Sequence, residues 1–238
     1  AALVGNESSR LLPKRVSLSF SASEMEQEIG ADGAAGYVVF SLFRPSVASY
    51  LVVVACNGTI ARVAPTTWVD GGSAPSRFEA VKMVDPSTVL AATTRGQVYT
   101  WAWRSGGDLE RVVDGTPWGA SGFDVQLSVD GRSVWQPNGS HFVRATRNGT
   151  VEASYLVPNC TDMNHVQLVE NETRAVVSCR GESSVVSYDL DERAATWVAG
   201  GAHGTLALKM DGVAYAAGQK LWSGQHNAEY VGEDSYLL

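Results

Sequence analysis

Three residues of this chain have the side chains best suited to chemistry, namely His165, Arg180 and His226. An imidazole is a competent nucleophile near neutral pH, and a guanidinium group holds anionic oxygens through paired hydrogen bonds. Each of the three lies beside the start or the end of an expected β-strand. Side chains so far apart in the sequence converge only if their strands are arranged radially around a common axis. The pattern predicts a β-propeller with a basic, histidine-bearing centre.

The elements that must position these residues are short strands separated by turns. Alternating and apolar runs recur along the chain, and the pairs Asp130-Gly131, Asn138-Gly139 and Asn148-Gly149 favour tight hairpins between them. The strands expected are 37–43, 49–55, 59–64, 78–84, 88–93, 97–103, 110–113, 125–128, 133–136, 141–146, 151–156, 165–169, 175–179, 184–189, 194–198, 205–210, 213–217, 220–222, 228–231 and 236–238.

These strands fall into groups of about four, and units of roughly 40 residues with four strands are typical of propeller blades. We expect an all-β chain in which residues 36–238 form about four to five blades of a six-bladed propeller. Residues 1–35 are expected to be an N-terminal extension or a partial outer strand. The last strands open a group that the chain does not finish, so we expect a clipped or incomplete sequence. A β-sandwich is the alternative, but the strands are too numerous for one of ordinary size.

The compartment is indicated by the asparagines, since six of the eight begin an Asn-x-Ser/Thr sequence. Such sequences are acceptors for N-glycosylation on the surface loops of secreted proteins. The alternative is that the Asn-Gly pairs are hairpin-turn chemistry alone. We therefore expect a secreted or cell-surface glycoprotein, and the start at Ala-Ala-Leu-Val indicates a processed product. The expected glycosylation sites are Asn6, Asn57, Asn138, Asn148, Asn159 and Asn171.

The three cysteines fit an oxidising compartment but leave one cysteine over. Cys160 and Cys179 flank one expected hairpin and are the predicted disulfide. Cys56 is then left to pair with a segment outside this chain. The alternative is three buried free thiols.

Composition and motifs exclude several classes of function. The net charge of −7 argues against a protein that binds the phosphate backbone of nucleic acids. No apolar run approaches the roughly 20 residues that a membrane-spanning helix needs. The sequence has no nucleotide-binding loop, zinc spacing or calcium loop. We expect no nucleic-acid partner, no membrane span, no cofactor and no metal.

Four motifs in the last third of the chain carry a family resemblance. They are Asp162 to His165 with Val169, then Ser178-Cys179-Arg180, then Asp189, Trp197 and Gly200-Gly201, then Gln225-His226. In this order and spacing, residues 162–238 resemble the C-terminal half of the arylsulfotransferase family, whose members are six-bladed propellers. The earlier strands resemble that family only as generic blades.

The resemblance implies sulfuryl transfer between phenolic compounds without a nucleotide donor. On this mapping His226 is the nucleophile, and His165 and Arg180 bind the sulfuryl oxygens. Sulfuryl transfer has a loose, anionic transition state by analogy with phosphoryl transfer, so such donors would stabilise it.

The chain also departs from the family pattern. Gln167 replaces an asparagine, Asn227 replaces the aspartate after the nucleophile, and Gly122-Phe123-Asp124 stands where the family has His-His-Asp. Loss of one such donor costs on the order of a hundredfold or more in rate. These departures favour a protein that keeps the fold and has lost the activity.

Two hypotheses follow, and the fold alone does not decide between them. The first is a secreted, N-glycosylated, arylsulfotransferase-like propeller that is a non-catalytic structural or binding component of an extracellular assembly. Its partners would be other chains or precursor fragments that complete the propeller at an open strand edge, and an anionic small molecule could bind at the axis. The alternative is an active sulfotransferase that acts on phenolic or glycan substrates through a histidine intermediate.

Overall fold

The computed structural model describes residues 36–44, 48–55, 58–65, 77–113, 123–210, 212–232 and 235–237. The chain divides into two compact units, Ala1–Pro75 and Ser76–Leu238. Apart from the short 3-10 turn η2 (Glu170–Glu172), the described elements are β-strands, so the predicted all-β class is confirmed. The predicted extension 1–35, with Asn6, and the pair Cys56 and Asn57 lie outside the described residues.

In the first unit, three antiparallel strands form one sheet in the order β1 (Tyr37–Arg44), β2 (Ala48–Ala55) and β3 (Ile60–Pro65). The central strand β2 buries Tyr50, Val52 and Val54, and apolar side chains of β1 and β3 pack against them. Leu51 and Val53, which point to the opposite face, are also fully buried, so β2 is covered on both faces.

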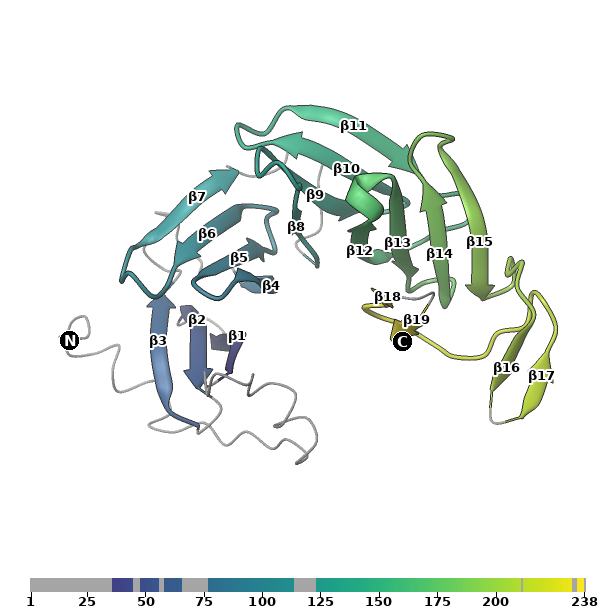
Figure 1. Ribbon diagram of the computed structural model, residues 1–238, viewed down its shortest axis with the longest axis horizontal. Helices are drawn as coiled ribbons and strands as arrows, with labels where there is room; N and C mark the ends of the chain where they lie inside the picture. The colour runs from purple at the N-terminus through teal and green to yellow at the C-terminus, as the bar shows by residue number, and fades with distance from the viewer. Residues whose placement is uncertain are drawn as a thin grey trace. The chain divides into compact units, whose positions relative to one another are not determined.

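The second unit contains three four-stranded antiparallel sheets in which each strand pairs with the next along the chain (Figure 1). The first sheet is β4 (Phe78–Asp85), β5 (Thr88–Thr93), β6 (Val98–Ala102) and β7 (Leu109–Val113). The second is β8 (Gln126–Leu127), β9 (Ser133–Asn138), β10 (His141–Thr146) and β11 (Val151–Leu156). The third is β12 (Met163–Val169), β13 (Arg174–Cys179), β14 (Ser184–Asp189) and β15 (Ala194–Gly200).

Successive sheets of this unit share apolar cores in chain order. Leu90 and Val98 of the first sheet pack in one cluster with Val134 of the second. Trp135 and Phe142 of the second sheet pack in another cluster with the third, and the Phe142 and Tyr188 rings meet edge to face with centroids 5.5 Å apart. Each sheet therefore buries its apolar faces against its neighbours in the sequence, as stacked β-sheets require.

Two shorter sheets follow, β16 (Leu208–Met210) with β17 (Val213–Tyr215), and β18 (Glu229–Gly232) with β19 (Ser235–Leu237). The predicted strand 220–222 is wrong, because these residues have no strand conformation. Gly218 and Gly224 on either side have φ values of +79° and +65°, a left-handed backbone that ends strand pairing. The segment contributes its Trp222 side chain to packing instead.

The predicted disulfide between Cys160 and Cys179 is confirmed, with a Cα–Cα distance of 5.1 Å. It joins the loop before β12 to the end of β13, so it closes the hairpin that carries His165. Both cysteines are buried in the same apolar cluster as Met163 and Val166. A cross-link over a loop of this size stabilises a fold by about 3 kcal/mol in the chain-entropy model.

Candidate functional site

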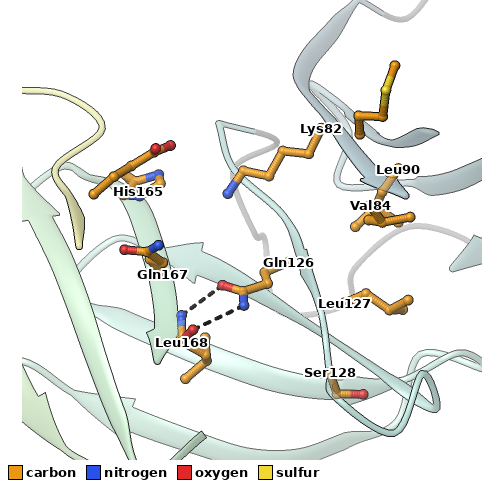
Figure 2. A pocket seen from close by; sticks show the side chains of 11 residues that line it. Lys82, Val84, Leu90, Gln126, Leu127, Ser128, His165, Gln167 and Leu168 are labelled. Carbon is orange, nitrogen blue, oxygen red and sulfur yellow. Dashed lines mark hydrogen bonds between the residues drawn. The ribbon is translucent and has the colours of Figure 1, made fainter. Parts of the chain in front are cut away.

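The first strands of the three four-stranded sheets, together with Leu90 of β5 and Glu229 of β18, line a pocket of about 550 Å³. Strand β4 contributes Lys82, β8 contributes Gln126, β12 contributes His165, and β18 contributes Glu229. In Figure 2 the Lys82 ammonium group points toward His165, and the Gln126 amide meets the backbone of Leu168. One wall of the pocket is apolar and is made by Met83, Val84, Leu90, Leu127 and Leu168.

His165 is the central polar residue of this pocket and is only 2% exposed. Its Nδ1 lies 2.8 Å from Oδ2 of Asp124, which is also buried. A carboxylate can only accept a hydrogen bond, so Nδ1 carries a hydrogen and donates the hydrogen bond to Asp124. Nε2 is buried and has no hydrogen-bond partner among the described residues. Because Nδ1 is bonded to Asp124, Nε2 is the ring nitrogen left for a ligand, as an acceptor when the ring is neutral and as a donor when both nitrogens are protonated.

Asp124 is held as an anion by four donors. Oδ1 accepts from the Lys82 ammonium at 2.7 Å and from the Val125 backbone N–H at 2.8 Å. Oδ2 accepts from the Val166 backbone N–H at 2.9 Å in addition to His165. Burial raises the pKa of Asp124, but the Lys82 charge and the His165 hydrogen bond outweigh it, so the pKa lies below its ordinary value.

The direction of the His165 side chain depends on an irregularity in the strand that carries it. The pairing of β12 with β13 shifts register between Met163 and His165, where one extra residue interrupts the ladder. Such a bulge re-aims the neighbouring side chains. Consecutive residues are buried along the regular strand β13 as well, from Ala175 to Cys179, so both faces of this sheet are covered and the bulge affects which face His165 lies on.

Two glutamines tie the first strands of neighbouring sheets together around the pocket. Gln126 on β8 accepts from the Leu168 backbone N–H at 2.7 Å and donates to its carbonyl at 3.3 Å. Gln167 on β12 repeats this with Tyr230 on β18, at 2.6 and 3.2 Å. Each side-chain amide takes the place of a neighbouring strand, because it hydrogen-bonds both the backbone N–H and the carbonyl of one residue. These two paired contacts hold β8, β12 and β18 side by side.

The three residues that the sequence singled out lie in different surroundings. His165 lines the pocket, whereas Arg180 and His226 are not among its lining residues. Arg180 forms an exposed ion pair with Asp162, whose carboxylate is 2.9 Å away. His226 is exposed, and its Nδ1 hydrogen-bonds the Gly224 carbonyl.

Sequence reasoning missed Lys82 and the role of Asp124 in this site. The family resemblance draws attention to Gly122-Phe123-Asp124 only for its missing histidines, and the structure shows the adjacent Phe123 to be 43% exposed. A buried aspartate can be suspected when it sits directly before an apolar strand, as Asp124 does before Val125. Its partners Lys82 and His165 are 42 and 41 residues away on other sheets, so no local signal names them.

The expected glycosylation sites that the structure describes lie at turns or strand ends. Asn148, Asn159 and Asn171 are exposed, and Asn138 is half-buried at the end of β9. Asn159 and Asn171 have left-handed φ values of 57° and 55°, a conformation that asparagine adopts more readily than most residues.

In the part of the chain that the structure describes, no helix has the length and apolar character to cross a membrane. Among those same residues, no three His, Cys, Asp or Glu side chains gather as the ligands of a metal ion would.

Comparison with known proteins gives a likeness of fold alone. No protein-family model matches the chain, and no curated protein matches it. A solved structure that is similar is the crystal structure of a protein of unknown function from Bacteroides caccae, with a TM-score of 0.50 and 12% sequence identity. The match covers 69% of this chain and 57% of that one, so the chain spans little more than half of that protein's length. The likeness supports the all-β, multi-sheet architecture and carries no function.

Proposed function

We propose that this chain is a β-propeller of the arylsulfotransferase type, part of a six-bladed one, with its ligand site on the axis at His165. The observation that carries the proposal is the pocket lined by Lys82, Gln126 and His165, because these come from the first strands of three successive four-stranded sheets. In a propeller the first strand of each blade lies nearest the axis. A shared pocket along first strands is what that arrangement produces.

The site binds a small organic molecule with a polar or anionic end and an apolar body, and it does not catalyse a reaction of that molecule. His165 Nε2 and the Lys82 ammonium provide the polar end of the pocket, and Val84, Leu90 and Leu127 provide an apolar wall. The family resemblance assigns sulfuryl transfer to His226 and Arg180 as well, and neither lines this pocket. Binding without chemistry is therefore the favoured function.

The protein is proposed to be a secreted glycoprotein that belongs to an extracellular assembly. Exposed acceptor sequences at Asn148, Asn159 and Asn171 and the Cys160–Cys179 disulfide support this compartment. Among the described residues, the sheets β16–β17 and β18–β19 have two strands each, where the first three sheets of the second unit have four. Another chain or a precursor fragment that adds strands to the last of these sheets is the proposed partner.

An active sulfotransferase is the second candidate, and one observation favours it. The buried carboxylate of Asp124 fixes the His165 tautomer and leaves Nε2 as the basic nitrogen. A histidine oriented in this way by a third group is the arrangement found in nucleophilic and general-base sites.

Calorimetry with 4-nitrophenyl sulfate on the full-length chain tests the binding proposal. We expect saturable binding that falls about tenfold or more in His165→Asn, because the sulfate is held by a ring that carries a proton on Nε2 as well, and the charge-assisted hydrogen bond from that N–H is worth about 1.5–3 kcal/mol. The asparagine amide can still donate to Asp124 from the position of Nδ1, but nothing replaces Nε2. His165→Gln is the matched control, because its longer side chain places a polar group near Nε2. Unchanged affinity in His165→Asn would refute the axial site.

Release of 4-nitrophenolate in the presence of a phenol acceptor tests the catalytic alternative. The proposal expects no transfer above background from the native protein. Robust transfer that disappears in both His165→Asn and His226→Ala would replace the binding function with the enzyme. Transfer that disappears only in His165→Asn would assign catalysis to the Asp124–His165 pair.

A further inference from the structure

A second cavity of about 490 Å³ lies on the sheet β12–β15, on the side that faces the last strands. Val185 and Ala199 of that sheet border it, together with Leu208 of β16 and Tyr236 of β19. The cavity shares none of its lining residues with the His165 pocket. Its size is that of ordinary binding sites for small organic molecules.

Three aromatic side chains, Trp197, Trp222 and Tyr236, form walls of this cavity and are held by the fold. The Trp197 and Tyr236 rings meet edge to face, with centroids 5.2 Å apart and an interplanar angle of 87°. Trp222 packs directly on Gly200, where a Cβ would come within 2.7 Å of its ring carbon Cζ2. Because a side chain at Gly200 would displace the indole, the glycine keeps the Trp222 wall in place.

The polar groups of the cavity are donors. Trp222 Nε1 and Arg174 Nε are buried and have no hydrogen-bond acceptor among the described residues. Arg174 keeps one ion pair, from Nη2 to Glu170 Oε1 at 2.8 Å, and its guanidinium lies over the Tyr230 ring at 5.1 Å. Lys209 is exposed beside the cavity and has no ion pair in the described parts of the chain. A buried donor without an acceptor is unfavourable, so a ligand acceptor that reaches these groups is favoured.

We propose that this cavity binds a small aromatic carboxylate or sulfonate. The aromatic body packs among Trp197, Trp222 and Tyr236, and the acidic group faces Lys209 and Arg174. The apolar walls supply the affinity for a ring, and the positive side chains select an anion over a neutral compound. This site goes beyond the axial function, because its residues come from other strands and other faces.

Calorimetry on the full-length protein with 2-naphthoate and its neutral analogue 2-naphthalenemethanol tests the proposal. We expect saturable binding of the carboxylate, about tenfold tighter than binding of the alcohol, as one charge-assisted contact provides. Tryptophan fluorescence should change on the same titration curve, because two of the three walls are indoles. Absence of saturable carboxylate binding, or equal affinity for both compounds, would overturn the proposal.

Three variants place the binding in this cavity. Lys209→Gln should abolish most of the preference for the carboxylate, and Trp222→Phe should weaken both probes while keeping an aromatic wall. His165→Asn should remove only such 2-naphthoate as binds at the axial pocket and should leave the binding that depends on Lys209 and Trp222 unchanged, which separates the two sites. Thermal unfolding of each variant checks that the fold is retained. Loss of binding in His165→Asn with no effect of Lys209→Gln would contradict the assignment.

Discussion

The Nδ1–H of His165 donates a hydrogen bond to the buried carboxylate of Asp124, with Nδ1 and Oδ2 2.8 Å apart, and this contact joins two neighbouring sheets. The same carboxylate receives the Lys82 ammonium from a third sheet at 2.7 Å. One buried anion thus holds the first strands of three sheets and also sets the tautomer of the histidine. The stability of the fold and the geometry of the site therefore both depend on Asp124.

Replacement of Asp124 by asparagine is expected to lower the free energy of unfolding by about 3–5 kcal/mol, because Lys82 and His165 lose a buried partner. Urea denaturation measures this change. Asp130→Asn is the matched control, since that carboxylate is exposed and should have a much smaller effect. A loss no larger than that of the control would mean that the buried ion pair contributes little.

The pKa of Asp124 lies below its ordinary value of 3.8 in the folded protein, because Lys82 and His165 favour the anion despite burial. A depressed folded pKa contributes stability that is present above the unfolded value and is lost as the pH falls through the folded value. We therefore expect unfolding measured from pH 6 down to pH 2 to show an acid-side loss of stability that is reduced in Asp124→Asn. Identical slopes for the two proteins would contradict the prediction.

Removal of the glutamine amides that link the strands should destabilise the second unit. Gln126→Leu leaves the Leu168 backbone N–H and carbonyl without their partner, at an expected cost of about 1–3 kcal/mol. Gln126→Glu keeps the acceptor for the N–H but sets a carboxylate oxygen against the carbonyl, so it should also destabilise. Gln219→Leu is the control, because that amide makes a local bond on the exposed surface. Urea denaturation ranks the variants.

Reduction of the Cys160–Cys179 disulfide is expected to lower stability by about 3 kcal/mol through the entropy of the unfolded chain. The double variant Cys160→Ala/Cys179→Ala should match the reduced wild-type protein and should not respond to reductant. Thermal unfolding with and without dithiothreitol measures both. A wild-type protein that is insensitive to reductant under denaturing conditions would show that the bond is absent in solution.

Treatment of the native protein with a peptide-N-glycosidase should reduce its intact mass. The exposed positions Asn148, Asn159 and Asn171 are accessible to modification and are the expected carriers. Each asparagine-to-glutamine variant at these positions should reduce the mass lost on treatment by the mass of one glycan. An unchanged mass after treatment would remove the main support for secretion.

The strands are the part of this protein that local sequence determines. Asn-Gly and Asp-Gly pairs separate the strands of the sheet β8–β11, and apolar runs bounded by other turn residues predicted the remaining four-stranded groups that the structure contains. The Cys160–Cys179 pair was also predictable, because both cysteines flank one hairpin. The predicted strand 220–222 is wrong because the segment lies between two left-handed glycines and its Trp222 side chain packs against Gly200.

The site was decided by tertiary structure. Lys82, Asp124 and His165 meet because consecutive sheets stack, and because a bulge in β12 changes the face of the sheet on which the histidine lies. Nothing near any of these residues in sequence encodes the other two, since a buried charge is stabilised only by partners that the packed sheets supply. Arg180 has the residue type for the same site, yet it lies in an exposed ion pair with Asp162. Residue type and strand position come from the sequence, whereas the direction of a side chain comes from the register and stacking of the sheets.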